Sequence, residues 1–252
     1  MTDTYDTYDP EKIRLSDEPV QVRIALRPIA PPAALGLAGF AGSTLIVSTW
    51  ICRWWGGPDS PVLFFPFIGL WGGLAQFIAG IYGFAARDVL VTIVNTMWGC
   101  FWMSQGILFG LVGVGAIEGH SVYTHYPEFA AWFIPLTMTT WVCALAATAR
   151  DLILSLTLFT LSIGCTIALT LFAYDPDTTR AGIKAAAYFW MASAMLAWWR
   201  SSVFVIEEAY GKTNLVKVFR IGRTAAEKSS LPIVAGLGEP GVKPGLPRIK
   251  KQ

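Results

Sequence analysis

Residues 152–173 read LILSLTLFTLSIGCTIALTLFA and contain no charged side chain. A helix that crosses the hydrocarbon core of a bilayer needs about 20 consecutive, mostly apolar residues. This stretch has the length and the composition of such a helix. It therefore predicts a membrane-spanning helix, and it places the chain among membrane proteins if other segments share its character.

Five other segments share it. The first five spans contain no Asp, Glu, Lys, Arg or His, whereas Lys184 and Arg200 lie near the two ends of the sixth. We expect these two long side chains to reach the lipid headgroups. The sequence therefore predicts an all-α, polytopic membrane protein with six transmembrane helices, at residues 33–52, 61–86, 89–117, 129–149, 152–173 and 183–205.

The composition agrees with a membrane protein. Hydrophobic residues make up 54% of the chain and charged residues only 14%, whereas soluble domains carry about 25% charged residues. A very apolar soluble core is the alternative, but several separate runs of spanning length argue against it. Four cysteines (Cys52, Cys100, Cys143 and Cys165) lie in or beside apolar runs without a C-x-x-C pair, so we expect packing roles and neither metal nor cofactor.

The charged residues between the spans predict the orientation. Arg87 and Arg150 lie in two very short turns, on the side that also receives both termini. We expect the protein in the inner (plasma) membrane. The positive-inside rule then predicts that both termini lie in the cytoplasm. We expect a polar N-terminal arm (1–32), a transmembrane domain (33–206) and a basic C-terminal tail (207–252), with no cleavable signal peptide.

The two turns also resemble each other. Ala86-Arg87-Asp88 is echoed by Ala149-Arg150-Asp151, at the junctions between pairs of predicted spans. Parallel two-helix repeats would produce such an echo. Short cytoplasmic turns that independently favour Arg and Asp remain the alternative.

Polar side chains inside the spans are the candidates for contact with a transported solute. Buried hydroxyl and amide groups in a membrane need hydrogen-bond partners, either a neighbouring helix or a ligand. Both interpretations stay open for the candidates, which are Thr44, Gln76, Asn95, Ser155 and Thr157. Small residues between 69 and 86, and at Gly106 and Gly110, predict close helix packing and permit an oligomer.

Four short blocks together resemble the acetate uptake transporter family. They are PPAALGLAGFAGST (31–44), GGLAQFIAGIYGF (72–84), TMWGCFW (96–102) and EEAYGKT (207–213), in the order and at the spacing of that family. The resemblance implies a channel or symporter for acetate and related small monocarboxylates, with succinate as a further substrate of some members. It also implies a hexameric ring in which each protomer has its own pore.

The resemblance further implies a pore constriction formed by Phe40, Trp98 and Leu156, the last within the triplet Ser155-Leu156-Thr157. Plain core packing is the alternative for these three residues. The sequence departs from the family pattern at several positions. Pro31 and Ala34 differ in the opening block, and Gly83 stands in place of an acidic residue. The turn before the third span reads Arg-Asp-Val (87–89), and Trp98 stands in place of tyrosine. These departures favour an altered substrate range.

Two other classes of function remain. A non-transporting membrane scaffold or accessory subunit could use the same fold, and co-purifying subunits would indicate it. An integral-membrane enzyme would need clustered reactive side chains at the membrane face. His120 and His125 share one polar loop with Glu118 and Glu128, where a solvated loop is the simpler interpretation. We therefore expect no enzyme, no nucleic-acid partner, and membrane lipids and further copies of the chain as partners.

Overall fold

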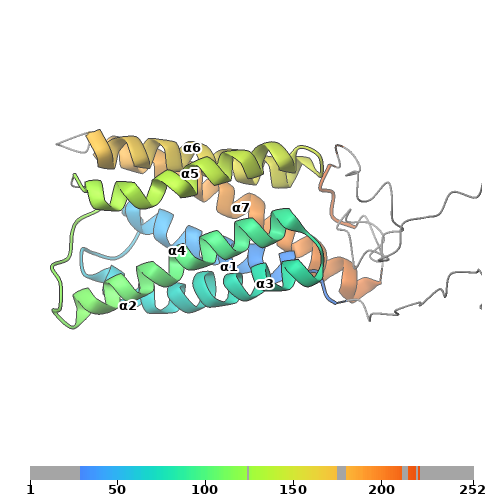
Figure 1. The fold of residues 1–252 in the computed structure, drawn as a ribbon, viewed down its shortest axis with the longest axis horizontal. Helices are drawn as coiled ribbons and strands as arrows, with labels where there is room; N and C mark the ends of the chain where they lie inside the picture. The colour runs from blue at the N-terminus through green and yellow to red at the C-terminus, as the bar shows by residue number, and fades with distance from the viewer. Residues whose placement is uncertain (1–28, 124, 175–179, 212–214, 220, 222–252) are drawn as a thin grey trace, which may run out of the picture.

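Helices that run up and down along one axis make up the protein (Figure 1). The computed structural model describes residues 29–123, 125–174, 180–211, 215–219 and 221, and these contain no β-strand. The predicted arm 1–32 and the predicted tail 207–252 therefore lie mostly outside the described residues. The helices are α1 (Pro32–Ile51), α2 (Ser60–Ile68), the π-helical segment η2 (Gly69–Ala75), α3 (Gln76–Ala85), α4 (Val89–Gly113), α5 (Pro127–Ala147), α6 (Leu152–Tyr174) and α7 (Arg180–Tyr210).

Five helical stretches of the described chain are long and apolar enough to cross a membrane. They are α1, the continuous run of α2, η2 and α3 (Ser60–Ala85), α5, α6 and α7 from Ala181. The helix α4 is 25 residues long, yet the amides Asn95 and Gln105 on its buried face lower its hydropathy and it is not among the five. The protein is thus a multi-pass membrane protein with an all-helical fold.

Aspartates begin two of the long helices and explain the echo of the two turns. Asp88 caps α4 by accepting a hydrogen bond from the backbone N–H of Val91 at 3.0 Å. Asp151 does the same at the start of α6, where it accepts from the N–H of Leu154 at 2.8 Å. A carboxylate is favourable at a helix N-terminus because it satisfies free N–H groups and faces the positive end of the helix dipole.

The predicted exposure of Arg200 at the headgroups is wrong. Its side chain is 2% exposed, and its Nε donates to Oδ2 of Asp151 at 3.0 Å. The guanidinium also lies over the ring of Phe204, 5.3 Å from its centroid. The helix α7 continues to Tyr210, so Arg200 lies inside the helix, where a carboxylate from α6 neutralises it.

The predicted close packing is present between the run η2–α3 and α4. A Cβ atom on Gly99 would lie 2.7 Å from the backbone N of Phe77, and a Cβ on Gly69 would lie 3.2 Å from Cα of Gly106. A Cβ on Gly83 would lie 2.5 Å from Oγ1 of Thr92. An acidic side chain therefore does not fit at position 83 in this helix pair, which accounts for the glycine there.

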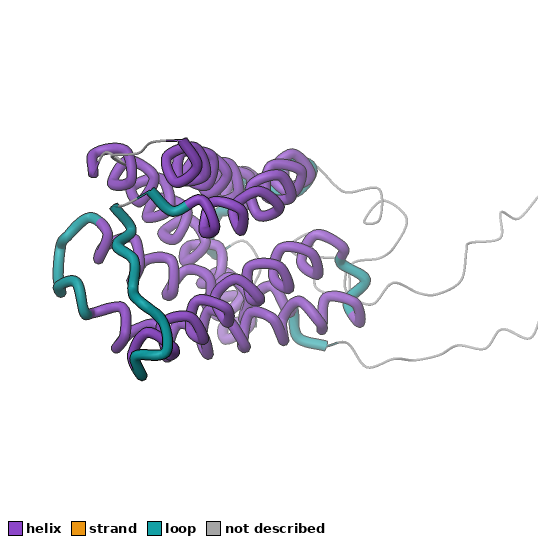
Figure 2. The backbone as a smooth tube through the Cα atoms, turned by 60° about the vertical axis from the view of Figure 1, so that its left-hand side comes forward, coloured by secondary structure: helices purple, strands orange, loops and turns teal. Residues whose placement is uncertain are grey.

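The remaining contacts arrange the helices around a central space. α1 packs against α7 on one side and against η2 and α3 on the other, α6 packs between α5 and α7, and α4 touches α5 along little of its length. The turns after α3 and α5 lie at the end of the bundle where α1 begins and α7 ends, and the loops 52–59 and 114–126 lie at the opposite end (Figures 1 and 2). The space between α1, α4, α5, α6 and α7 holds the candidate site.

Candidate functional site

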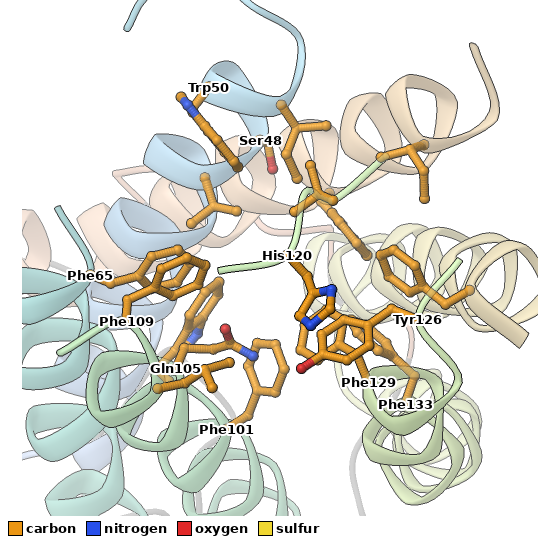
Figure 3. A pocket seen from close by; sticks show the side chains of 18 of the residues that line it. Ser48, Trp50, Phe65, Phe101, Gln105, Phe109, His120, Tyr126, Phe129 and Phe133 are labelled. Atoms are coloured by element: carbon orange, nitrogen blue, oxygen red, sulfur yellow. The ribbon is translucent and has the colours of Figure 1, made fainter. Parts of the chain in front are cut away.

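The described helices enclose a cavity toward each end of the bundle. The first, here called the loop-end cavity, is lined by residues of α1, α2, α4, α5, α6 and α7 and by the loop residues Glu118, His120, Ser121, Val122 and Tyr126 (Figure 3). The second, here called the arginine-end cavity, lies near the turns that follow α3 and α5. It is lined by Ala33, Leu37, Phe40, Gln76, Leu90, Val91, Val94, Asn95, Arg150, Leu154, Thr157, Leu158, Leu161 and Arg200.

Aromatic rings dominate the wall of the loop-end cavity. Phe65 and Phe109 stack with their centroids 4.2 Å apart, and His120 stacks on Tyr126 at 4.5 Å. Figure 3 shows the His120 ring between Gln105 on one side and Tyr126 on the other. The loop therefore folds back over the helix ends, and its polar side chains, His120 among them, join the aromatic wall of the cavity.

Several buried polar atoms of the loop-end cavity have no hydrogen-bond partner within the described part of the chain. They are Oγ1 of Thr44, Oγ of Ser48, Nε1 of Trp102, Nε2 of Gln105 and Nε1 of Trp190. Leaving a buried polar group unsatisfied costs about 1–3 kcal/mol. Because these groups line a cavity, water or a polar solute can satisfy them there.

The two cavities meet at an aromatic pair. Phe40 lines the arginine-end cavity, Trp98 lines the loop-end cavity, and their rings pack edge to face with centroids 6.4 Å apart. Leu161 of α6 lines both cavities. The indole N–H of Trp98 donates to Oγ1 of Thr140 at 3.2 Å, which fixes the orientation of this ring. An apolar barrier thus separates the two spaces.

Amide groups and arginines give the arginine-end cavity its polar character. Gln76 is 1% exposed, and neither its Oε1 nor its Nε2 has a partner among the described residues. Asn95 donates from Nδ2 to the carbonyl of Val91 at 2.9 Å. A Cβ on Gly36 would lie 2.1 Å from Oδ1 of Asn95, so the glycine of the first sequence block leaves room for this amide.

Six of the predicted site residues line the two cavities. Thr44 and Trp98 line the loop-end cavity, and Phe40, Gln76, Asn95 and Thr157 line the arginine-end cavity. The Thr157 hydroxyl donates to the carbonyl of Ile153 at 2.8 Å, so it bonds its own helix.

The other two predicted site residues line neither cavity. Leu156 is 40% exposed on the outer face of α6, and the buried Ser155 hydroxyl donates to the carbonyl of Asp151 at 2.8 Å. Leu161 lies between the cavities instead, within the similar triplet Thr160-Leu161-Ser162. The sequence contains both triplets, and only the helix rotation decides which leucine points inward.

Sequence reasoning missed the two arginines of the site. Arg150 donates from Nη1 to Oδ2 of Asp88 at 2.7 Å, and Arg200 pairs with Asp151 as described above. Arg150 lies in the turn after α5, as the sequence predicts, and it lines the arginine-end cavity there together with the buried Arg200. The repeated Arg-Asp sequence in the two turns could have indicated these ion pairs, because it places a carboxylate at the start of two helices.

The loop with the two histidines holds no metal-type cluster. Among the described residues, no group of three or more His, Cys, Asp or Glu side chains could hold a metal ion. The donors of the site are hydroxyl, amide, indole and guanidinium groups, which suit hydrogen bonding to an anion or to water.

Two comparisons place the chain among known proteins. The structure is similar to one described as the structure of the bacterial acetate channel SatP, with a TM-score of 0.62 and 19% sequence identity, over 74% of this chain and 98% of that one. At this identity the likeness shows a shared fold. A curated relative, the glyoxylate pathway regulator of Yarrowia lipolytica (strain CLIB 122 / E 150), is 31% identical over 131 residues, which are 48% of this chain and 46% of that protein. The match thus spans about half the length of this relative.

A family model gives the assignment. The model of the GPR1/FUN34/yaaH family matches residues 16–218, which include every described helix. The four sequence blocks that resemble acetate uptake transporters lie within this range. The chain therefore belongs to the GPR1/FUN34/yaaH family, the acetate transporter family that its sequence resembles.

Proposed function

We propose that the two cavities form one conduction path for acetate and related small monocarboxylates, with succinate at the upper end of the size range. The observation that carries this proposal is that both cavities contain buried polar atoms without hydrogen-bond partners among the described residues, with Gln76 supplying those of the arginine-end cavity. The apolar barrier of Phe40, Trp98 and Leu161 lies between the two cavities. The family membership and the fold shared with an acetate channel support it.

The polar atoms replace the water that a carboxylate loses on entering the bilayer. An unsatisfied ion in an apolar medium costs many kcal/mol, so a path for anions must offer donors along its length. Hydroxyl, amide and indole N–H groups in the cavities are such donors. The apolar barrier then excludes hydrated ions, as hydrophobic constrictions do when they lose their water.

The substrate carries its own proton across the barrier. Among the described residues that line the two cavities, Glu118 at the mouth of the loop-end cavity is the one carboxylate, and none lies near the barrier. No acidic side chain of this lining is placed to relay a proton past the barrier. The substrate therefore crosses the barrier as the neutral acid and ionises on either side of it. Uptake should therefore rise as the external pH falls, and a pH-independent uptake rate would count against co-movement.

The membrane arrangement completes the proposal. All six long helical stretches, α4 included, span the inner (plasma) membrane, with both termini in the cytoplasm. Residues 33–206 form the transport domain, and residues 1–32 and 207–252 are cytoplasmic extensions. Protomers assemble as a homo-hexamer in which each has its own path. Exposed apolar side chains such as Leu63, Phe67 and Leu70 support a surface that faces lipid or a neighbouring protomer.

Uptake of labelled acetate into proteoliposomes tests the function. Phe40→Ala and Trp98→Ala open the barrier and should change the saturable uptake rate. Leu161→Ala and Leu156→Ala form a matched pair on one helix, because the first leucine lines both cavities and the second faces outward. Only Leu161→Ala should alter uptake. If the folded wild-type protein moves no acetate, propionate, lactate or succinate, the scaffold function replaces this proposal.

A further inference from the structure

The lining of the arginine-end cavity has an unusual balance of charge. Among the described residues that line it, Arg150 and Arg200 are cationic and none is anionic. Their partners Asp88 and Asp151 contact the guanidinium groups without lining the cavity. Each aspartate is also held by a backbone N–H of the helix that it caps, so both carboxylates are fixed outside the space. The cavity thus presents a cationic wall whose charge is balanced from outside.

A second observation points to an occupant. The Gln76 side chain is 1% exposed, lines the same cavity, and has no hydrogen-bond partner for either end of its amide in the described structure. A buried amide without partners is costly, and a bound ligand that hydrogen-bonds to it would offset that cost. The Gln76 amide can donate to a carboxylate oxygen or accept from a hydroxyl group.

We propose that the arginine-end cavity is a carboxylate-binding site in which Arg150 and Arg200 hold the anionic group and Gln76 donates to it. This assignment rests on the proposed transport function and names its selectivity site. Guanidinium groups stay charged and present several N–H donors in one plane, which suits a carboxylate. The apolar side chains of Val94, Leu158 and Leu161 form the rest of the wall and fit a short alkyl chain.

The paired aspartates set the strength of binding. A substrate that meets two guanidinium groups already neutralised from outside binds less tightly than it would to bare cations. Conduction needs such moderate binding, because a solute that enters a path must also leave it. The site holds one carboxylate at the guanidinium groups and leaves the rest of the solute among leucine and valine side chains, so it favours acetate and other monocarboxylates over succinate.

The test compares acetate with acetamide, its neutral analogue, in proteoliposomes. The double variant Asp151→Asn/Arg200→Gln removes one cation together with its counter-charge, and Gln76→Leu removes the amide at similar volume. Each should raise the KM for acetate by about tenfold or more, the size expected for a lost charge-assisted hydrogen bond, and leave acetamide permeation within twofold of wild type. Lys217→Gln, which neutralises an exposed cation, is the matched control and should change neither.

The outcomes separate binding from structural support. If the aspartates and arginines only tie helices together, the double variant lowers the melting temperature and both variants keep the wild-type KM, which overturns the proposal. Gln76→Leu carries the test if the double variant does not fold, because removing an unsatisfied amide should leave the melting temperature unchanged or raise it. If the wild-type protein moves no acetate, the transport function fails. The binding proposal is then decided by whether acetate, and not acetamide, raises the melting temperature of wild type but not of Gln76→Leu.

Discussion

The two cavities of this protein differ in how their polar groups are made. At the loop end, the donors are hydroxyl, indole and amide groups among aromatic rings, and a loop contributes His120. At the arginine end, two guanidinium groups are anchored by Asp88 and Asp151, which also cap α4 and α6. In the proposed function, the loop end collects a small organic acid and the arginine end recognises its charge. On that proposal, charge recognition lies where helix ends and ion pairs converge.

The largest expected effect is a loss of stability when an arginine is removed from the arginine end and not from the loop end. Arg200→Ala leaves Asp151 buried without its partner, and removing one member of a buried pair costs about 3–5 kcal/mol. Arg53→Ala, at the loop end, removes an exposed guanidinium that lies over Tyr123 and should change stability far less. Thermal unfolding in detergent, followed by fluorescence or size exclusion, measures both. Equal losses would mean that the arginine end is no more dependent on charge than the loop end.

The next effect concerns α4, which is a wall of both cavities. Gly99→Ala places a methyl group 2.7 Å from the backbone N of Phe77, so the helices must move apart, at a cost of about 1–3 kcal/mol. Gly110→Ala, on the same helix, meets no atom within 4 Å and serves as the matched control. Lower melting temperature and altered acetate uptake are expected for Gly99→Ala alone. Wild-type behaviour of this variant would show that close packing of α3 and α4 does not shape the path.

A smaller effect tests the barrier between the cavities. Trp98→Phe keeps an aromatic ring but removes the N–H that donates to Thr140, a loss of about 1 kcal/mol for one hydrogen bond. The ring is then less firmly held against Phe40, and acetamide should permeate faster. Thr140→Val removes the acceptor and should have the same effect. Stopped-flow measurement of liposome swelling gives the rate, and unchanged permeation in both variants would contradict a barrier held by this bond.

The smallest effect is expected at the mouth of the loop-end cavity. His120→Lys places a fixed cation beside Tyr126, and His120→Gln places a neutral amide there. If charge is recognised at the arginine end, the two variants should differ by less than twofold in KM for acetate. A tenfold difference between them would move charge recognition to the loop end. Labelled acetate uptake at one fixed pH decides between the two.

Much of the fold could be predicted from the sequence because apolar length and short charged turns encode it directly. The bounds of the predicted spans agree with the helices to within a few residues, except that α7 continues past residue 205 to Tyr210. The helix α4 is not among the five stretches that are long and apolar enough to cross a membrane. The glycine-rich run 69–86 indicated the close approach of two helices. The π-helical turn η2 within that run leaves no sequence signal that separates it from an ordinary helix.

The site was less predictable because it depends on helix rotation and on contacts between distant segments. Thr44, Gln76 and Asn95 were identified because buried polar groups are rare in apolar spans. Leu156 and Leu161 occupy nearly identical local sequence, so only the packing of α6 distinguishes the inward leucine. The ion pair of Arg200 and Asp151 joins residues 49 positions apart, and the sequence around Arg200 does not predict its partner.

Access from the two sides of the membrane tests most directly whether the two cavities form one path. In a cysteine-free background, Thr44→Cys introduces a thiol in the loop-end cavity and Asn95→Cys introduces one in the arginine-end cavity. An anionic, membrane-impermeant thiosulfonate should label the first only from the loop side and the second only from the turn side. Labelling at either position should stop acetate uptake. Uptake that continues after both positions are labelled, or labelling of both from one side, would contradict a single path divided by the barrier of Phe40, Trp98 and Leu161.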